Sequence, residues 1–294
     1  LAGNSAARPV LDRISLKIRQ GETVCLVGES GSGKSVTSLA IMGLLPKGAL
    51  EATGGRIDLS GQNLLDLAPQ EMRAMRARRI AMIFQEPMTA LNPVLRVGEQ
   101  IEEVLRTHLK LSASERKARV LAIMEQVHLP DIDRIYSAYP HQLSGGQRQR
   151  IMIAMALVLE PQLLIADEPT TALDVTTQRQ ILSLIAELQE KHGTAVLFIT
   201  HDMGVVAEIA DSVHVMKQGS MVEHASVEAL LCQPQEDYTR KLLQSVPSLT
   251  PRPARAAVFD QPALQVEDLQ KTYGTHKVFG KAEQSFAASD VSFA

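Results

Sequence analysis

Aromatic side chains are scarce in this chain of 294 residues. Phenylalanine, tyrosine and tryptophan together make up 3%, and tryptophan is absent. Hydrophobic residues nevertheless reach 45%, so the core must be built mainly from aliphatic side chains. The scarcity of aromatics also limits the platforms on which a nucleic-acid base or a sugar could stack.

Cysteine, excess charge and long hydrophobic runs are also missing. The two cysteines, Cys25 and Cys232, have neither a metal-binding nor a CxxC spacing, which favours a reducing compartment. We expect Cys25, within an apolar run, to be a small core residue. The net charge of -3 gives no basic field for nucleic acid. Apolar runs such as 154–159 and 163–166 are shorter than the roughly 18 residues of a membrane span.

The beginning of the sequence shows no sign of a leader peptide. Residues 1–8 contain no apolar run typical of a signal peptide and no initiator methionine. We therefore expect the chain to be part of a longer one.

Strand-like and helix-like segments alternate through most of the sequence, which predicts an α/β fold. Helical spacing replaces this alternation over 97–129, so we expect a helical insert. We predict a strand and turn over 56–61, and a hairpin that turns at 218–220 and continues into 221–223. The other expected strands are 23–27, 79–84, 163–166, 195–199 and 213–216, and the other expected helices are 34–45, 148–159, 175–192, 203–210, 227–232 and 238–245.

A glycine-rich loop follows the first strand and opens a helix. Its residues are Gly28, Glu29, Ser30, Gly31, Ser32, Gly33, Lys34 and Ser35, which satisfy the phosphate-loop pattern GxxxxGK[ST]. Glycines let several N–H groups converge on phosphate oxygens, and the start of the helix adds its positive dipole end. Lys34 would reach the β and γ phosphates, and the Ser35 hydroxyl would bind Mg²⁺. The sequence therefore predicts nucleotide binding.

Two further segments carry polar residues at the ends of regular elements. The apolar strand 163–166 runs into Asp167 and Glu168, and Pro169 ends it at the sheet edge. An aspartate there can help to hold Mg²⁺, and the next acid can face an attacking water. The second segment is Leu-Ser-Gly-Gly-Gln at 143–147, in which Ser144 is also expected to cap the following helix.

Six motifs occur in the order seen in ATP-binding cassette (ABC) ATPases. They are the phosphate loop, Gln85 after a strand, the segment 143–147, Asp167 with Glu168, the segment 172–174, and His201 after a later strand. Residues 10 to about 245 therefore resemble one ABC nucleotide-binding domain, an α/β P-loop NTPase with a helical subdomain. The segment 143–147 excludes small-molecule P-loop kinases, which share the phosphate loop but do not need this second motif.

The resemblance implies roles for the polar residues near the phosphate loop. The loop would contact ATP, while Ser35, Gln85 and Asp167 would attend to Mg²⁺. Glu168 would be the general base that polarises water, and His201 would contact the γ-phosphate. Taken alone, His201 is more typical of a solvated histidine at a helix start.

The resemblance also implies a second copy of the domain, because two ABC cassettes sandwich two ATP molecules head to tail. Ser144, Gly145, Gly146 and Gln147 would contact the ATP held by the opposite cassette. Asp174 would lie at the seam between the two cassettes.

Four segments, 84–93, 139–146, 200–208 and 238–247, are similar to the dipeptide and oligopeptide importers of this family. The most similar members are the bacterial glutathione import proteins, which carry two cassettes on one polypeptide. Glu236 and Asp237 depart from this branch, which usually has His-Pro there.

The importer resemblance implies two membrane-spanning permease subunits, a periplasmic or extracellular substrate-binding protein, and a peripheral place on the cytoplasmic face of the bacterial inner membrane. The block 97–129 would face the permeases, although amphipathic packing accounts for part of its pattern. Glutathione, dipeptides, oligopeptides and nickel chelates all stay open as substrates.

We expect three parts along the chain. A cassette spans 1–245 with a helical subdomain at about 95–160, a proline-rich linker spans 246–262, and the first strands of a second, truncated cassette span 263–294. Residues 288–293 align weakly with 11–16, and Tyr273 occupies the position of the aromatic that stacks on adenine. Its counterpart in the first cassette would fall before residue 1, so we expect this chain to bind ATP more weakly than a longer one that contains it.

Two other functions compete with transport. Non-transport ABC proteins act on DNA or ribosomes, but they carry long coiled-coil insertions or basic linkers, and 246–262 has two arginines and no lysine. A regulatory or scaffold cassette without catalysis is disfavoured by the intact set Lys34, Asp167, Glu168 and His201.

Overall fold

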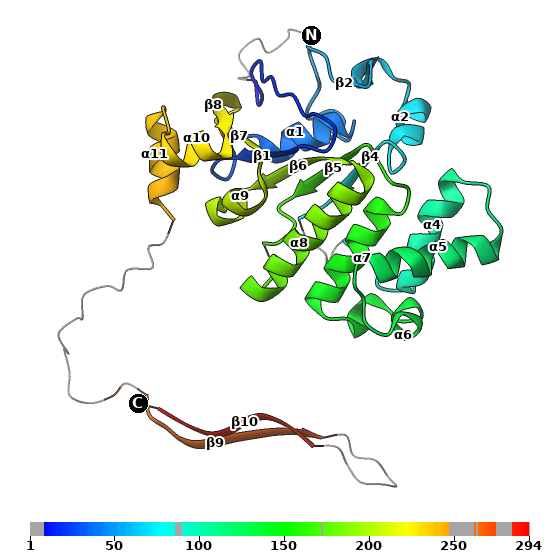
Figure 1. Ribbon diagram of the computed structural model, residues 1–294, viewed down its shortest axis with the longest axis vertical. Helices are drawn as coiled ribbons and strands as arrows, with labels where there is room; N and C mark the ends of the chain where they lie inside the picture. Colours follow the sequence, from blue (N-terminus) through cyan, green and yellow to red (C-terminus); the bar gives the residue numbers. More distant parts are fainter. Residues whose placement is uncertain are drawn as a thin grey trace. The chain divides into compact units, whose positions relative to one another are not determined.

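A central sheet of six strands organises the larger of the two units of the chain, residues 1–247 (Figure 1). The computed structural model describes residues 9–85, 90–171, 173–246, 262, 264–274 and 284–293. The strand order is β4-β5-β6-β1-β7-β8, with β8 antiparallel to β7 and all other neighbours parallel. The strands are β1 (Thr23–Val27), β4 (Ile80–Ile83), β5 (Leu163–Asp167), β6 (Ala195–Thr200), β7 (Ser212–Lys217) and β8 (Ser220–Ser226).

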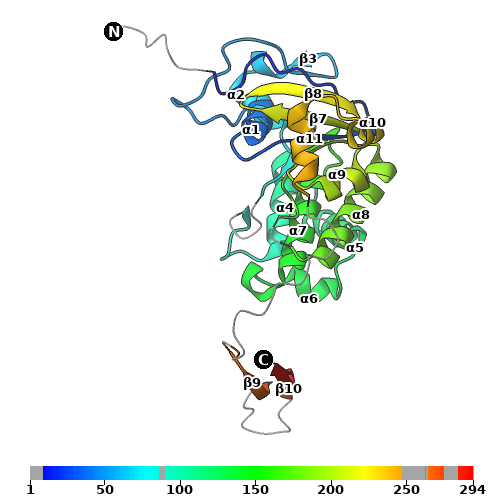
Figure 2. The same cartoon turned by 90° about the vertical axis from the view of Figure 1, so that its left-hand side faces the viewer.

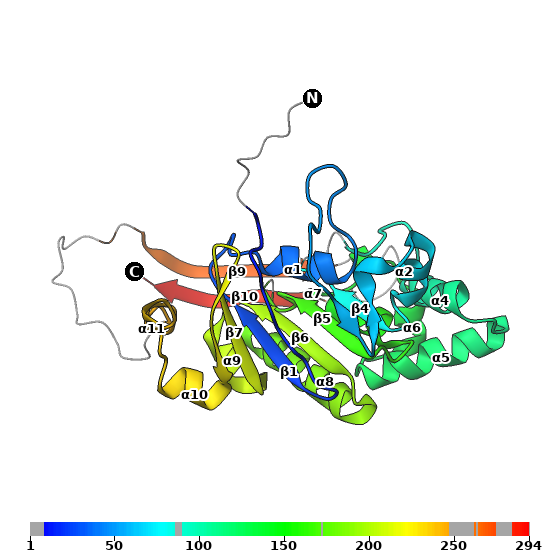
Figure 3. The same cartoon turned by 90° about the horizontal axis from the view of Figure 1, so that it is seen from above.

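The central strand β1 is buried along its whole length because helices cover both faces of the sheet (Figure 3). Side chains alternate along a strand, so Val24 and Leu26 join one core while Cys25 and Val27 join the other. The first core includes α1 (Lys34–Ile41) and α2 (Pro69–Met75). The second includes α7 (Gly145–Leu157), α8 (Val175–His192) and α9 (Met203–Ile209).

Cys25 is fully buried, as predicted. Burial, assisted by the nearby negative charge of Asp211, raises the pKa of its thiol to about 12. The thiol is therefore protonated at neutral pH and acts as a core side chain.

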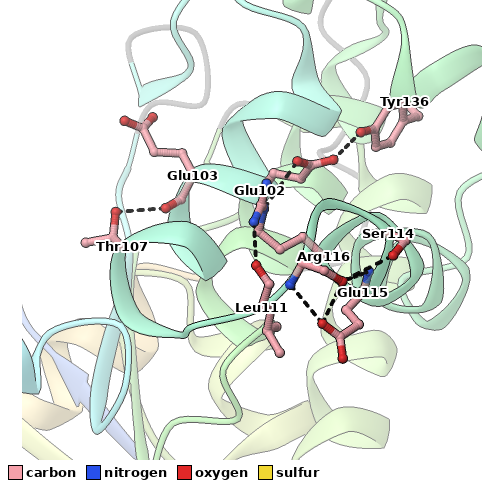
Figure 4. Close-up of polar contacts among 9 residues, drawn as sticks. Glu102, Glu103, Thr107, Leu111, Ser114, Glu115, Arg116 and Tyr136 are labelled. Atoms are coloured by element: carbon pink, nitrogen blue, oxygen red, sulfur yellow. Dashed lines mark hydrogen bonds and ion pairs between the residues drawn. The ribbon is translucent and has the colours of Figure 1, made fainter.

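The expected helical block lies between β4 and β5. It contains α4 (Val97–His108), α5 (Ala113–Gln126), α6 (Ile132–Tyr136) and α7. Figure 4 shows how polar side chains join three of these helices. The Tyr136 hydroxyl of α6 donates to Glu102 of α4, and Arg116 of α5 lies 3.7 Å from the same carboxylate.

Close packing reinforces this junction, since a Cβ on Gly98 would overlap the ring of Tyr136. Burial and the neighbouring Glu102 raise the pKa of the Tyr136 hydroxyl to about 12, which keeps it a hydrogen-bond donor.

No helix in the described part of the chain is both long and apolar enough to cross a membrane.

One helix is shorter than predicted. The expected helix 34–45 ends at Ile41, because Gly43 adopts a left-handed conformation with φ of 60°. The guanidinium of Arg76 binds the end of the helix by donating to the carbonyls of Met42 at 2.9 Å and Gly43 at 2.8 Å. The stop is thus set by a residue from a distant segment as well as by glycine.

The strand and turn predicted over 56–61 form part of a short hairpin, in which the strand begins at Asp58. β2 (Asp58–Leu59) pairs with β3 (Gln62–Asn63) around Ser60 and Gly61, which both have positive φ. The turn at 218–220 is also confirmed, but β8 continues to Ser226, beyond the predicted 221–223, because β7 offers it a pairing partner to Ser212.

Two short helices follow β8, namely α10 (Val227–Cys232) and α11 (Asp237–Gln244). They gather with β8 at one edge of the sheet (Figure 2). Both agree with the predicted helices to within one residue at each end.

The second unit, 248–294, contains an antiparallel pair, β9 (Val266–Gly274) and β10 (Gln284–Phe293). Its register shifts at three positions, and Asp268 and Asp290, which lie in the shifted part, both have positive φ. Residues 288–293 lie in β10, whereas the aligned residues 11–16 form neither strand nor helix. Most of the expected linker, 247–261, and the side chain of Tyr273 lie outside the described residues.

Candidate functional site

The loop between β1 and α1 needs glycine at several positions. Gly31 and Gly33 have φ of 79° and 105°, values that side-chain-bearing residues rarely adopt. A Cβ on Gly28 would overlap the carbonyl oxygen of Met216 in β7. The loop is therefore tightly wrapped and lies directly against the sheet.

Three segments far away in the sequence support this loop. The N–H of Gly219, in the β7–β8 turn, donates to the carbonyl of Ser32 at 2.9 Å. The N–H of Glu29 donates to the hydroxyl of Tyr238 in α11 at 3.2 Å. A Cβ on Gly33 would come within 2.7 Å of the Leu11 side chain.

Lys34 folds back onto the start of its own loop. Its ammonium donates to the carbonyl oxygens of Gly28 at 2.8 Å and Glu29 at 3.0 Å. The residue is 6% exposed, and burial lowers the pKa of Lys34, while Glu168 and Asp167 oppose that shift. A buried ammonium held by two neutral backbone carbonyls is suited to meet an incoming polyanion.

The end of β5 places an acid beside the loop. The Ser35 hydroxyl donates to Asp167 Oδ1 at 3.3 Å. Burial raises the pKa of Asp167, and the hydrogen bond from Ser35 partly offsets this. A hydroxyl and a carboxylate in contact are a pair of oxygen ligands of the kind that Mg²⁺ prefers.

Glu168 collects partners from three other segments. Gln85 Nε2 donates to Glu168 Oε2 at 2.9 Å, and the Thr171 hydroxyl donates to the same oxygen at 3.1 Å. Nδ1 of His201 lies 3.3 Å from Glu168 Oε1. Glu168 itself has a positive φ of 47°, and its N–H donates to the carbonyl of Ile199 in β6. This strained turn points the carboxylate away from the strand and into the polar cluster.

The donors of the loop fit a nucleotide phosphate. No side chain caps the start of α1, so the positive end of the helix is available to an anion. The hydroxyl of Ser32 is buried and has no hydrogen-bond partner among the described residues. Lys34 adds a positive charge, and Ser35 with Asp167 could hold the accompanying Mg²⁺.

A separate groove of about 500 Å³ contains the segment 144–147 and Asp174. Ser144 caps α7, as predicted, by accepting from the N–H of Gln147 at 3.3 Å, and the Gln147 side chain accepts from the N–H of Ser144. Asp174 caps α8 in the same way through Thr177. Two helix starts thus lie side by side, and a Cβ on Gly146 would come within 2.8 Å of Thr177.

The predicted site residues fall into these two groups. One cluster unites the residues around the phosphate loop, namely Lys34, Ser35, Gln85, Asp167, Glu168 and His201. The groove unites Ser144, Gly145, Gly146, Gln147 and Asp174. Among the described residues no hydrogen bond or ion pair joins the two groups. Ala172, which belongs to the motif before Asp174, lies outside them.

Two contacts of the site were not predicted. Thr171 binds Glu168, and its position three residues later in the same turn could have suggested this. Tyr238 binds the loop from α11, and no local pattern could indicate that contact because β7 and β8 bring it there.

Residues 11–171 match the ABC transporter family. The chain belongs to this family. It is an ABC cassette with the P-loop NTPase fold, and the chemistry of such cassettes is ATP hydrolysis with Mg²⁺. The expected fold class is confirmed.

Curated relatives extend the match beyond this region. The cassette is 51% identical to a probable peptide ABC transporter ATP-binding protein, y4tR, of Sinorhizobium fredii, over 83% of this chain and 73% of the relative. It is 52% identical to the dipeptide transport ATP-binding protein DppD of Bacillus subtilis, over 80% of this chain and 70% of the relative. A glutathione import ATP-binding protein, GsiA, of Salmonella choleraesuis is 50% identical over 88% of this chain, which spans 43% of that relative's length.

Solved structures agree with the family assignment. A dimeric ATP-binding cassette, MJ0796, in a post-hydrolysis state with ADP and Pi is 32% identical, with a TM-score of 0.65 over 74% of this chain and 90% of that one. CbiO1 of Clostridium perfringens, part of the ABC transporter complex cbiONQ, is 27% identical, with a TM-score of 0.67 over 83% of this chain and 92% of that one.

Proposed function

We propose that this cassette is the ATP-hydrolysing subunit of a bacterial importer for glutathione, dipeptides or oligopeptides. The observation that carries the proposal is the cluster in which Lys34, Asp167 and Glu168 meet at the phosphate loop. The names of the relatives, which concern peptide, dipeptide and glutathione transport, favour import over action on nucleic acid or ribosomes.

Within the cluster each side chain takes a distinct role. Lys34 binds the β and γ phosphates together with the N–H groups of residues 28–35. Ser35, Gln85 and Asp167 hold Mg²⁺, which supplies charge neutralisation of the phosphates when bound. Glu168 accepts the proton of the attacking water, and His201, 58% exposed beside it, contacts the γ-phosphate.

The groove serves the second nucleotide site of a cassette pair. Ser144, Gly145, Gly146 and Gln147 contact the ATP held by the opposite cassette, and Asp174 lies at the seam. The groove supports this, because it brings the segment 144–147 and Asp174 together although they lie about 30 positions apart in the sequence.

The chain divides as the motifs indicate. A cassette spans 1–245 with its helical subdomain at about 95–160, the linker spans 246–262, and 263–294 form the first strands of a second cassette. The partners are a second ABC domain, two permease subunits and, through them, a substrate-binding protein. The cassette therefore acts at the cytoplasmic face of the inner membrane, and nucleic acid is not a partner.

Reconstitution tests this function. The protein is combined with the permeases and the binding protein encoded beside its gene in proteoliposomes loaded with ATP, and uptake of labelled glutathione, a dipeptide and an oligopeptide is followed. We expect uptake of at least one of them, and none with Lys34→Ala as a matched control. ATP hydrolysis stimulated by DNA or ribosomes, without uptake of any of the three, would refute transport.

A further inference from the structure

Tyr238 links the phosphate loop to the far end of the cassette. It lies in α11, well outside the residues 11–171 that match the family. Its hydroxyl accepts the N–H of Glu29 at 3.2 Å. Among the hydrogen bonds of the described loop residues, this is the one that comes from the C-terminal helices.

The bond acts on a peptide group that also holds Lys34. A peptide unit is planar and trans, so its C=O and N–H point in opposite directions. In the Gly28–Glu29 peptide the N–H donates to Tyr238, and the C=O accepts from the Lys34 ammonium at 2.8 Å. Tyr238 and Lys34 therefore hold the two edges of a single peptide plane.

Tyr238 is itself held in place from two directions. The ammonium of Lys217, at the end of β7, lies 4.8 Å from the centre of its ring. The start of α11 is anchored to β8, because both oxygens of Glu223 accept backbone N–H groups, from Gln235 at 2.8 Å and Glu236 at 3.1 Å. The sheet strands β7 and β8 thus hold the Tyr238 hydroxyl in its place beside the loop.

We propose that Tyr238 is a positioning residue for nucleotide binding. Its hydroxyl fixes the orientation of the Gly28–Glu29 peptide, and this peptide fixes the Lys34 ammonium in the place where phosphates arrive. Lysine has a long, flexible stem, so an acceptor of fixed direction reduces the freedom that binding must remove. The inference rests on the proposed binding of ATP by the phosphate loop and adds a residue from α11 to it.

The test is Tyr238→Phe in the full chain, with ATP affinity measured by calorimetric titration. This change removes the hydroxyl and keeps the ring against Lys217. We expect the Kd for ATP to rise about three- to ten-fold, the size expected for one lost hydrogen bond. KM for ATP should rise by a similar factor with little change in kcat, and the thermal midpoint without nucleotide should fall by no more than about 2–4 °C, the shift expected for one lost hydrogen bond in a domain of this size.

Tyr139→Phe is the matched control, because it makes the same chemical change in the helical block. Its Kd should remain that of the wild type. A double-mutant cycle with Lys34→Ala then tests whether the hydroxyl acts through Lys34. In the Lys34→Ala background, Tyr238→Phe should change the Kd for ATP little, because the ammonium is gone.

The outcomes separate this inference from the proposed function. Failure of the wild-type chain to bind ATP would refute ATP binding itself. Binding by the wild type with an equal Kd for Tyr238→Phe would refute only the positioning role. An equal further loss in the Lys34→Ala background would show that the hydroxyl acts by another route, which also overturns the inference.

Discussion

The two groups of site residues are built in different ways. The cluster around Glu168 includes a local bond from Thr171, but others of its hydrogen bonds join residues that are far apart in the sequence, such as Ser35 with Asp167 and Gln85 with Glu168. In the groove, the bonds of Ser144 and Asp174 join residues three positions apart. The cluster therefore depends on the assembled sheet, whereas the groove depends on the starts of two helices that could form locally.

The same difference appears in two aspartates. Asp167 lies in the cluster at 6% exposure, and burial raises its pKa above the ordinary value. Asp174 is exposed in the groove, and hydrogen bonds from Thr177 lower its pKa. Burial thus disfavours the charged form of Asp167, whereas hydrogen bonds within its own helix start favour the charged form of Asp174.

The largest expected effect is on catalysis within the cluster. Glu168→Gln should lower ATP hydrolysis by about 10²- to 10⁴-fold, because the amide cannot accept the proton of water. ATP binding should persist, since Lys34 and the loop are untouched. Phosphate release and calorimetric titration measure the two effects, with Glu228→Gln, an exposed change in α10, as the control. Normal phosphate release by Glu168→Gln would contradict the assigned base.

The next effect concerns how far the loop depends on the sheet. Gly28→Ala would place a Cβ on the backbone carbonyl of Met216, which cannot move aside, so we expect a loss of about 3 kcal/mol or more in unfolding free energy. Gly31→Ala meets no atom within 4 Å, so only its positive φ should cost about 1–2 kcal/mol. Urea unfolding without nucleotide compares them. Equal losses would mean that the loop is not held against β7.

A smaller effect is expected in the groove. Ser144→Ala should lower the unfolding free energy by about 1 kcal/mol through loss of the α7 cap, without changing the Kd of an isolated cassette for ATP. Ser226→Ala removes the corresponding cap of α10 and should cost a similar amount. Only Ser144→Ala should also slow ATP hydrolysis by paired cassettes. If both variants hydrolyse ATP equally well, the groove does not serve the opposite nucleotide.

The smallest effect is a difference in titration. NMR should find the carboxyl pKa of Asp167 above, and that of Asp174 below, the ordinary value for aspartate. The two aspartates therefore change the folding stability in opposite directions as the pH falls. The stabilisation by Asp174 is present above its unfolded pKa and is lost as pH falls through its lower folded pKa, whereas protonation of Asp167 at falling pH relieves a cost. Thr177→Val should return the pKa of Asp174 toward normal and leave Asp167 unchanged.

Much of the fold could be predicted from the sequence, because periodicity and end signals are local. The strand 23–27, the helix 175–192 and the helix 227–232 have the predicted bounds. The predicted end of the helix 34–45 was wrong, because Gly43 and the distant Arg76 end the helix at Ile41. The predicted strand 221–223 is shorter than the observed β8, because the length of this strand depends on its pairing with β7.

The sequence by itself determined the family, because the motifs are short patterns of residue types with fixed order and spacing. It also determined the cap at Ser144, whose partner lies within one helical turn. Only the tertiary structure decided which groups surround Glu168 and which residue from α11 reaches Glu29. Those contacts join segments up to 209 positions apart, and a separation of that length carries no local signal until the sheet brings the segments together.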